Sequence, residues 1–466
     1  MRIKYTKGKF ERKIMSNHTK RNQIDMLNGS MWGKIPLYAL PVAATAILEQ
    51  LFNASDIAVV GNFTGSGKTV AVAAVGANSP IIGLIINLFV GIALGCNVVI
   101  ANAIGRENKE RVSKAVHTSV IISVLGGVFI AVLGEIIASP LLKSLQVPDD
   151  VFASTLLYLR IYLLGMPVIL LYNFESAIFR SVGETKTPLV ALAVSGVLNV
   201  LLNLFFVAIL HMTVNGVAIA TVISNVVSSA ILFIKLIKSE HTIKIEFSKL
   251  KIDGKILLQI IKIGLPAGIQ GAVFAVANIV IQSAINSLGT IVMAASSAAL
   301  NLEVFTYDIL TSFGQACTTF TGQNYGAKKY SRCRQALKIS LLEGAITLVI
   351  SIGIVFISGK YLLAIFNNDT RVIELGYTRL ILVMSAHIFS LIYEVISGYL
   401  RGFGISLVPA ILTTLGVCVV RIIWIKLYLP HHQTFEAILT AYPISLSLTA
   451  VLMFAAMICY RPTKNL

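Results

Sequence analysis

The sequence predicts an all-α polytopic membrane protein with twelve transmembrane helices in two pseudo-symmetric six-helix bundles. Its composition supports this fold class, because 56% of its 466 residues are hydrophobic, 13% are charged and the mean hydropathy is +0.83. Soluble globular domains are far less apolar. Two further observations agree: twelve apolar stretches are long enough to cross a bilayer, and basic residues recur in alternate loops.

The apolar stretches give the expected helices in chain order. Each runs for about 20 residues or more without a break, the length that a helix needs to cross the hydrocarbon core. Transmembrane strands would instead give shorter segments of alternating polarity. The expected spans are 35–61, 74–101, 115–139, 155–178, 187–210, 214–236, 256–285, 292–320, 337–358, 376–399, 406–428 and 435–459.

The longest polar stretch between spans, residues 237–255, divides the twelve spans into two sets of six. We therefore expect an N-terminal bundle at 34–236, a cytoplasmic linker at 237–255 and a C-terminal bundle at 256–460. Residues 1–33 are expected to form a cytoplasmic N-terminal extension. This extension is polar and basic and contains no apolar segment with a cleavage site, so no cleaved signal peptide is expected.

Two stretches that lie 221 residues apart repeat one pattern of Arg, Gly and Pro, and each stands between two long apolar segments. Repeats of this kind are typical of secondary transporters, in which the substrate path runs between the repeats. Six spans in each half make the repeat parallel, so its axis is expected along the membrane normal. The matching positions, expected at equivalent places near the cytoplasmic side, are Arg180, Gly183 and Pro188 in one half and Arg401, Gly404 and Pro409 in the other.

The formal net charge of +17 is distributed as a topology signal. Basic residues gather before the first span and after the second, sixth and eighth spans, whereas the intervening loops carry few. Loops rich in Lys and Arg stay on the cytoplasmic side, so both termini are expected there. Because the charges are not clustered on one domain, we expect no nucleic-acid partner.

Four segments resemble those of the multidrug and toxic compound extrusion (MATE) transporters of bacteria, and the resemblance covers about residues 34 to 460. The segments are the run Thr321–Lys329, the Arg-x-x-Gly-x-x-x-x-Pro element of each half, Ser55–Gly61 and Ala441–Ser445. The resemblance implies a monomeric antiporter of the bacterial cytoplasmic (inner) membrane. It would couple H⁺ or Na⁺ entry to the efflux of amphipathic, often cationic compounds by alternating access.

The resemblance also implies a cation site in the N-terminal half. In this pattern Asp56, at the end of the first span, belongs to the cation site, together with Asn199 and Asn203 in the fifth span and Thr221 in the sixth. The sequence departs from the pattern at Asn203, where the family has aspartate. One carboxylate among amide and hydroxyl oxygens suits Na⁺, and a desolvated carboxylate also suits a proton. Asp56 could instead be solvated at the membrane surface, and the two Asn could only join helices.

Charged groups at bilayer depth are costly and therefore require a cavity, a partner or a proton. Glu303 is one such group, either as a cavity carboxylate for cationic substrates or as the partner of a buried arginine, with Arg421 as one possibility. The seventh span contains no acidic residue, so no second Na⁺ site is expected there. The residues expected to line the substrate cavity are Gln50, Tyr172, Glu175, Gln270, Glu303 and Glu394.

Three other interpretations are weaker. Residues 62–69 end like a phosphate-binding loop, but Asn62 replaces the first glycine and no strand precedes it. The five cysteines show no paired spacing, so neither disulfides nor a metal site are expected beyond Na⁺ at Asp56. The chain lacks the metal or nucleophile motifs of a membrane enzyme, so we expect no enzyme and no cofactor.

A lipid-linked oligosaccharide flippase remains the alternative function. Such flippases usually have fourteen spans or a strongly basic central cavity for phosphates. This chain offers twelve spans and several acidic residues within them, set against Arg421 and the pair of Arg180 and Arg401.

Overall fold

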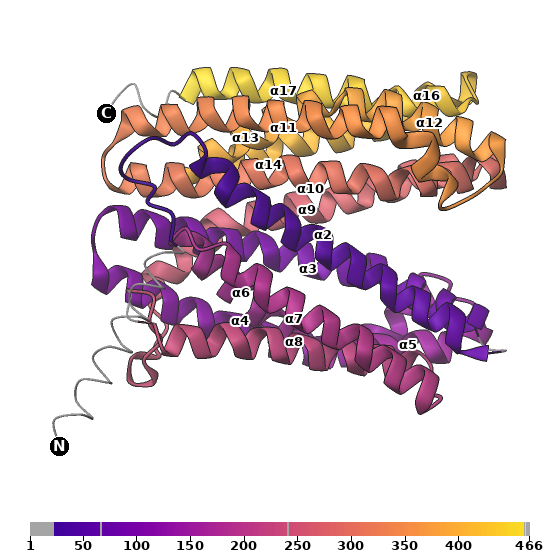
Figure 1. Ribbon diagram of the computed structural model, residues 1–466, viewed down its shortest axis with the longest axis horizontal. Helices are drawn as coiled ribbons and strands as arrows, with labels where there is room; N and C mark the ends of the chain where they lie inside the picture. The colour runs from indigo at the N-terminus through magenta and orange to yellow at the C-terminus, as the bar shows by residue number, and fades with distance from the viewer. Residues whose placement is uncertain (1–22, 66–67, 240–241, 461, 463–466) are drawn as a thin grey trace.

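The computed structural model describes residues 23–65, 68–239, 242–460 and 462. Within this part of the chain all regular secondary structure is helical (Figure 1). Nine described helices are long and apolar enough to cross a membrane, and two bent helix pairs bring the number to 11. The remaining span is α10, which is 37 residues long and more polar. The predicted fold class is therefore confirmed.

The helices form two lobes that match the two halves of the sequence (Figure 1). The first lobe comprises α2 (Lys34–Phe63), α3 (Lys68–Gly105), α4 (Lys109–Ser144), α5 (Asp149–Leu164), α6 (Met166–Ser181), α7 (Lys186–Leu204) with the π-helix η2 (Phe205–Ile209), and α8 (Val214–Ile237). The second comprises α9 (Gly254–Asn286), α10 (Thr290–Gly326), α11 (Tyr330–Ala364), α12 (Thr370–Ser385), α13 (His387–Gly402), α14 (Leu407–Thr413) with the π-helix η4 (Thr414–Val419), α15 (Val420–Leu427), η5 (Leu429–His431), α16 (Phe435–Leu439) and α17 (Ala441–Tyr460).

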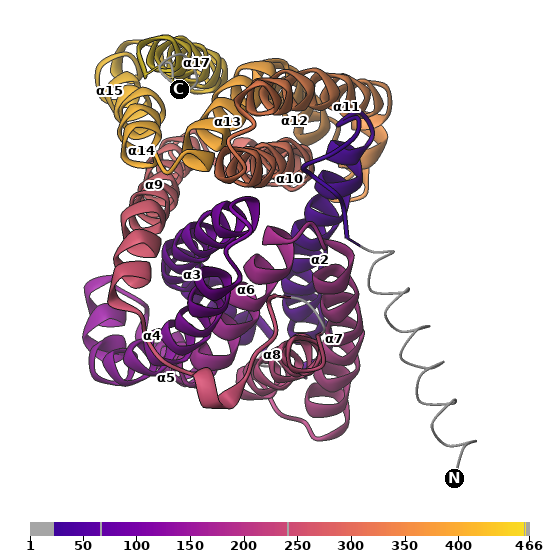
Figure 2. The same cartoon turned by 90° about the vertical axis from the view of Figure 1, so that its left-hand side faces the viewer.

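The first helix of each half begins in the core of the opposite lobe. The start of α2 contributes Ile35, Tyr38 and Val42 to the apolar core of the second lobe. The start of α9 likewise contributes Ile256 and Ile260 to a core of the first lobe. Seen end-on in Figure 2, α2 and α9 lie at opposite edges of the boundary between the lobes. These two helices therefore connect the lobes mechanically.

Glycines allow the lobes to approach closely along α3, α9 and α10. A Cβ atom at Gly91 or Gly95 of α3 would overlap the backbone of α9, and one at Gly105 would overlap the carbonyl of Gln323 in α10. The contact is reciprocal, because a Cβ at Gly326 would overlap the carbonyl of Asn102 in α3. Gly105 and Gly326 are 221 residues apart, and each precedes a basic loop. The lobes are thus in tight contact on the side of these loops.

Replacing Gly105 with Val should disrupt this contact, since the side chain has no space beside the Gln323 carbonyl. We expect a lower unfolding temperature of the purified protein, with the same effect for Gly326→Val. The control is Gly353→Val in α11, where an added Cβ meets nothing within 4 Å. Equal unfolding temperatures for Gly105→Val and Gly353→Val would contradict the prediction.

Two spans expected to be continuous, 155–178 and 376–399, are bent. The angle is 50° between α5 and α6 and 41° between α12 and α13. Pro167 lies at the start of α6 and lacks the amide that would continue the helical hydrogen bonds, which accounts for the first bend. Pro41, in contrast, is accommodated inside α2 without a break.

Residues 23–33 of the predicted N-terminal extension pack against both lobes, while residues 1–22 lie outside the described residues. The Ile24 amide donates to the carbonyl of Gly183 in the first lobe at 3.2 Å. In the second lobe, the Glu343 carboxylate accepts from the Gly33 amide at 2.9 Å, and Arg332 donates to the Gly29 carbonyl at 2.9 Å. This segment therefore reinforces the same tightly packed side.

The described part of the linker that follows residue 241 packs against α4 of the first lobe. The backbone amide of Glu246 in the linker donates a hydrogen bond to His117 of α4, with 3.0 Å between the amide nitrogen and Nε2. Asp253 then caps α9 by accepting from the amides of Ile256 and Lys255. These hydrogen bonds lower the pKa of the Asp253 carboxyl, because they stabilise its charged form.

Candidate functional site

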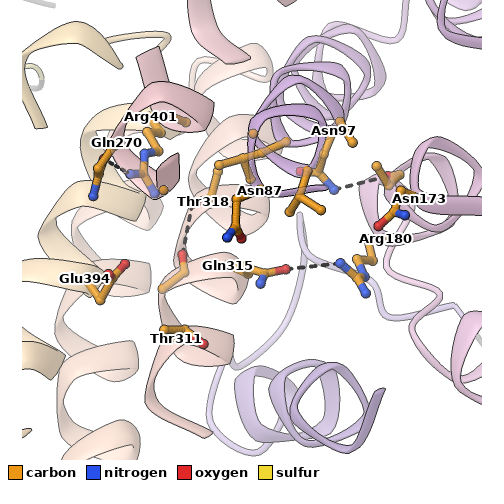
Figure 3. A pocket seen from close by; sticks show the side chains of 18 of the residues that line it. Asn87, Asn97, Asn173, Arg180, Gln270, Thr311, Gln315, Thr318, Glu394 and Arg401 are labelled. Atoms are coloured by element: carbon orange, nitrogen blue, oxygen red, sulfur yellow. Dashed lines mark hydrogen bonds between the residues drawn. The ribbon is translucent and has the colours of Figure 1, made fainter. Parts of the chain in front are cut away.

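A cavity of about 370 Å³ lies between the two lobes. Its walls come from α2, α3, α6, α9, α10 and α13, so both halves of the sequence contribute. Aromatic rings of Tyr38, Phe274 and Tyr307 face it alongside polar groups. The polar lining shown in Figure 3 comprises Asn87, Asn97, Asn173, Arg180, Gln270, Thr311, Gln315, Thr318, Glu394 and Arg401.

The two arginines of the sequence repeat both line this cavity, and each donates to a glutamine (Figure 3). Arg180 of α6 reaches Gln315 of α10 with 3.3 Å between Nη1 and Oε1, so this bond joins the lobes. Arg401 of α13 reaches Gln270 of α9 with 2.7 Å between Nη2 and Oε1. The sequence identified these residues as markers of the repeat and as basic groups that a flippase could use. Their shared Arg-Gly-Pro register was the available signal of a common role.

Glu394 is the one carboxylate among the residues that line the central cavity. Its Oε1 accepts a hydrogen bond from the Tyr307 hydroxyl at 3.2 Å. The cavity therefore carries two guanidinium groups and one carboxylate, together with amides and aromatic rings. Such a lining can bind amphipathic molecules with groups of either charge.

The six residues expected in the substrate cavity are dispersed. Gln270 and Glu394 line the central cavity, whereas Tyr172 lines a smaller cavity of the first lobe. Glu175 is fully buried and accepts from the Ser229 hydroxyl at 2.9 Å. Gln50 is exposed on α2. Gln50, Tyr172 and Glu175 do not line the central cavity, because spacing along a span does not determine which face of the helix points to the lobe boundary.

Glu303 lies in the second lobe and is paired with a buried arginine. Its Oε2 accepts from Arg379 at 2.9 Å from Nη2 and 3.2 Å from Nε. Arg379 is only 2% exposed and also donates to the Ser296 hydroxyl at 2.9 Å. The partner is therefore Arg379 of α12, not Arg421, and Glu303 is not a free carboxylate for substrates in the central cavity.

The four residues expected at the cation site do meet in the first lobe. Asp56, which is 4% exposed, accepts from the side-chain amide of Asn203 through Oδ1. Its Oδ2 lies 3.1 Å from the Thr221 hydroxyl. The Asn203 amide also lies 3.1 Å from Oδ1 of Asn199, which stands one helical turn away on the same face of α7. Two helices, α7 and α8, thus deliver polar groups to the one carboxylate on α2.

The cluster borders a cavity of about 120 Å³ that is lined by Asp56, Asn199, Thr221 and other side chains of the first lobe. One acceptor in the cluster, Oδ1 of Asn203, is buried without a hydrogen-bond partner among the described residues. Buried polar atoms rarely remain unpaired. No group of three or more His, Cys, Asp or Glu side chains in the described part of the chain could hold a metal ion. A cation here would therefore depend on one carboxylate with amide and hydroxyl oxygens.

Two six-span lobes around a polar and aromatic cavity define a multi-pass membrane transporter built from a parallel repeat. The MatE family model matches residues 41–205 and 266–425, once in each half, and the chain belongs to this family. The resemblance found in the sequence is thereby confirmed.

Relatives and solved structures agree over nearly the whole chain. The chain is 25% identical over 434 residues to "Probable multidrug resistance protein YoeA" of Bacillus subtilis, with 91% of this chain and 93% of the relative covered. It is 25% identical to "Probable multidrug resistance protein NorM" of Thermotoga maritima, covering 82% of each. A solved structure described as the outward-facing conformation of a multidrug resistance MATE family transporter matches with a TM-score of 0.87 at 20% identity, covering 95% of this chain and 98% of that one.

Proposed function

We propose that this protein is a cation-coupled multidrug efflux antiporter that exports amphipathic, often cationic compounds through the central cavity. The names of its relatives support multidrug efflux. The observation that carries the coupling role is the buried Asp56 with its surrounding amide and hydroxyl groups. Either H⁺ or Na⁺ can be the coupling ion at this carboxylate.

The chemistry of the Asp56 cluster suits reversible cation binding. Rotation of the Asn203 amide by 180° would turn its unpaired oxygen toward Asp56, and the oxygens of Asn199 and Thr221 are close by. Na⁺ would then find one charged and several neutral oxygen ligands. A proton would instead neutralise Asp56 while Asn203 and Thr221 kept their contacts. One charge moving across 100 mV supplies about 2.3 kcal/mol in either case.

Helix α2 can couple cation binding at Asp56 to the arrangement of the two lobes, because it contacts both. Asp56 lies toward its C-terminal end in the first lobe, whereas Tyr38, near its start, lies 2.8 Å from the Thr319 hydroxyl in the second lobe. A cation that binds Asp56 with different affinity in the two access states shifts their populations. Pro41 leaves α2 without one amide hydrogen bond between these points, so bending is least costly there.

Orientation follows from the charge pattern. If the basic loops are cytoplasmic, the glycine contacts at Gly105 and Gly326 close the cytoplasmic side. The described conformation would then give access to the central cavity from outside the cell. Cation binding from the outside and substrate binding from the inside would favour opposite states.

The direct test is efflux of a fluorescent organic cation from proteoliposomes under separately imposed Na⁺ and H⁺ gradients. We expect accelerated efflux with one of the two gradients and none without a gradient. Absence of dye efflux under every gradient would contradict the antiporter. The flippase alternative draws on Arg180 and Arg401 in the central cavity, but Glu394 in the same cavity would oppose a pyrophosphate. A flippase would not move the dye.

Replacing Asn203 with Asp should tighten Na⁺ binding severalfold, because a second carboxylate would stand beside Asp56. The same change should shift the pH dependence of transport, since two neighbouring carboxylates share protons. Na⁺ affinity is measured by calorimetry on the purified protein. The control is Asn62→Asp, which makes the same chemical change at an exposed position of α2. Equal Na⁺ affinity in the wild type and Asn203→Asp would show that Asn203 only packs.

A further inference from the structure

A separate cavity of about 160 Å³ lies inside the second lobe. It adjoins the central cavity, since Phe274, Asn278 and Tyr307 line both. Its remaining walls come from α9, α10, α12, α13, α15 and α17. Neither the coupling ion at Asp56 nor transport through the central cavity explains its composition.

Positive charge exceeds negative charge in this cavity. The lining contains two guanidinium groups, Arg379 and Arg421, but one carboxylate, Glu303. Both Nε and Nη2 of Arg379 are directed to the same oxygen of Glu303. This pair is therefore self-contained, and Arg421 provides the charge in excess.

Arg421 is 3% exposed and lies near the middle of the span that contains α15. Its Nε donates to the Ser445 hydroxyl at 3.0 Å, and its guanidinium lies 4.2 Å from the centre of the Tyr442 ring. Among the residues that the structure describes, no Asp or Glu lies within 4.0 Å of it. A charge at this depth without a counter-ion is costly, so an anion entering the cavity would be stabilised.

A second side chain in the same cavity has an unused polar atom. His387, also 3% exposed, has Nδ1 3.4 Å from the Ser390 hydroxyl, and its Nε2 is buried without a hydrogen-bond partner among the described residues. When Ser390 donates to Nδ1, the neutral imidazole carries its hydrogen on Nε2. His387 then carries an unpaired donor, and Arg421 lines the same cavity with further donors.

The cavity is small, and aliphatic side chains form a large part of its remaining lining, next to the polar side chains of Asn278, Gln282, Tyr307, Ser390, Tyr393 and Tyr442. The aliphatic lining residues are Ile281, Ile285, Leu300, Val304 and Leu446. An apolar cavity of about 150 Å³ has room for one benzene ring. The size and the lining together therefore fit one aromatic ring that carries a single acceptor group.

We propose that this cavity is a binding site for an aromatic monocarboxylate. The carboxylate accepts hydrogen bonds from Arg421 and from Nε2 of His387, and the ring lies against the apolar wall. The bound anion supplies the counter-ion that Arg421 lacks. This site is distinct from the Asp56 cluster, and its occupancy does not depend on which ion drives transport.

The test uses the purified full-length protein and measures binding of radiolabelled benzoate by equilibrium dialysis. Benzamide, which has nearly the same shape without the charge, is the ligand control. We expect saturable binding of one benzoate per chain and at least roughly tenfold weaker binding of benzamide, as for the loss of a charge-assisted pair. Equal binding of the two ligands, or no benzoate binding, would overturn the proposal.

Four variants locate the ligand. Arg421→Gln should weaken benzoate binding at least roughly tenfold, whereas Lys426→Gln, which removes an exposed charge from the same helix, should leave it unchanged. Val304→Phe keeps Arg421 and His387 but fills the cavity, so it should also abolish binding; it keeps the proposal testable if Arg421→Gln does not fold. Benzoate binding that survives both cavity variants but is lost in Arg180→Gln would place the anion in the central cavity and refute the proposed site.

Discussion

Asp56→Asn is expected to reduce cation-coupled efflux to the rate of liposomes without protein, while the protein still folds and inserts. The variant removes a buried charge and creates none, so its structural cost is small. Its amide oxygen can still accept from Asn203, and its amide nitrogen can donate to the Thr221 hydroxyl, which also reaches the Val217 carbonyl. An amide, however, cannot take up a proton and supplies no charge for Na⁺. Efflux of a fluorescent cation under a fixed ion gradient measures the effect.

The control for this experiment is Asp149→Asn, which neutralises an exposed acidic residue in the first turn of α5. It should transport at the wild-type rate, which separates loss of the coupling group from a general change of charge. If Asp56→Asn retained wild-type efflux with the same ion dependence, Asp56 would not be the coupling group. The search would then move to Glu394, the carboxylate of the central cavity.

The fold was predictable because its main signals are local in the sequence. Bilayer thickness sets the length of each apolar run, so each span could be recognised from its own stretch of sequence. The exchange of α2 and α9 between the lobe cores was not predictable, since it depends on contacts between distant segments. The bend between α12 and α13 was likewise missed. An apolar run indicates that a segment crosses the membrane, but it does not show whether the helix is straight.

Some residues of the candidate sites could likewise be named from the sequence, and others could not. Asn199 and Asn203 share a helix face by their spacing, and the family pattern linked them to Asp56 and Thr221, so this group could be named from sequence. Arg379 could not be assigned to Glu303, because the 76 residues between them carry no signal of contact. Arg180 and Arg401 were visible as a repeat, but only the arrangement of the lobes turns both toward one cavity.

Arg379→Gln is expected to destabilise the protein by about 3–5 kcal/mol, the usual cost of removing one member of a buried ion pair. Arg379 is 2% exposed, and its loss would leave Glu303 charged or force it to take up a proton. The double variant Glu303→Gln with Arg379→Gln should recover much of this loss, because it leaves no uncompensated charge. Denaturant unfolding in detergent measures the stability of the purified wild type and of both variants.

The matched control is the exposed pair of Lys360 and Glu374, whose side chains are 50% and 56% exposed. Exposed ion pairs contribute at most about 1 kcal/mol, so Lys360→Gln should have little effect. A similarly small effect of Arg379→Gln would mean that water reaches Glu303 through the adjoining cavity and screens its charge. A double variant no more stable than Arg379→Gln would instead assign the loss to packing of the Arg379 side chain against Tyr442, whose ring lies 5.4 Å away. The ion pair is the source of the stability only if the single variant is strongly destabilised and the double variant recovers.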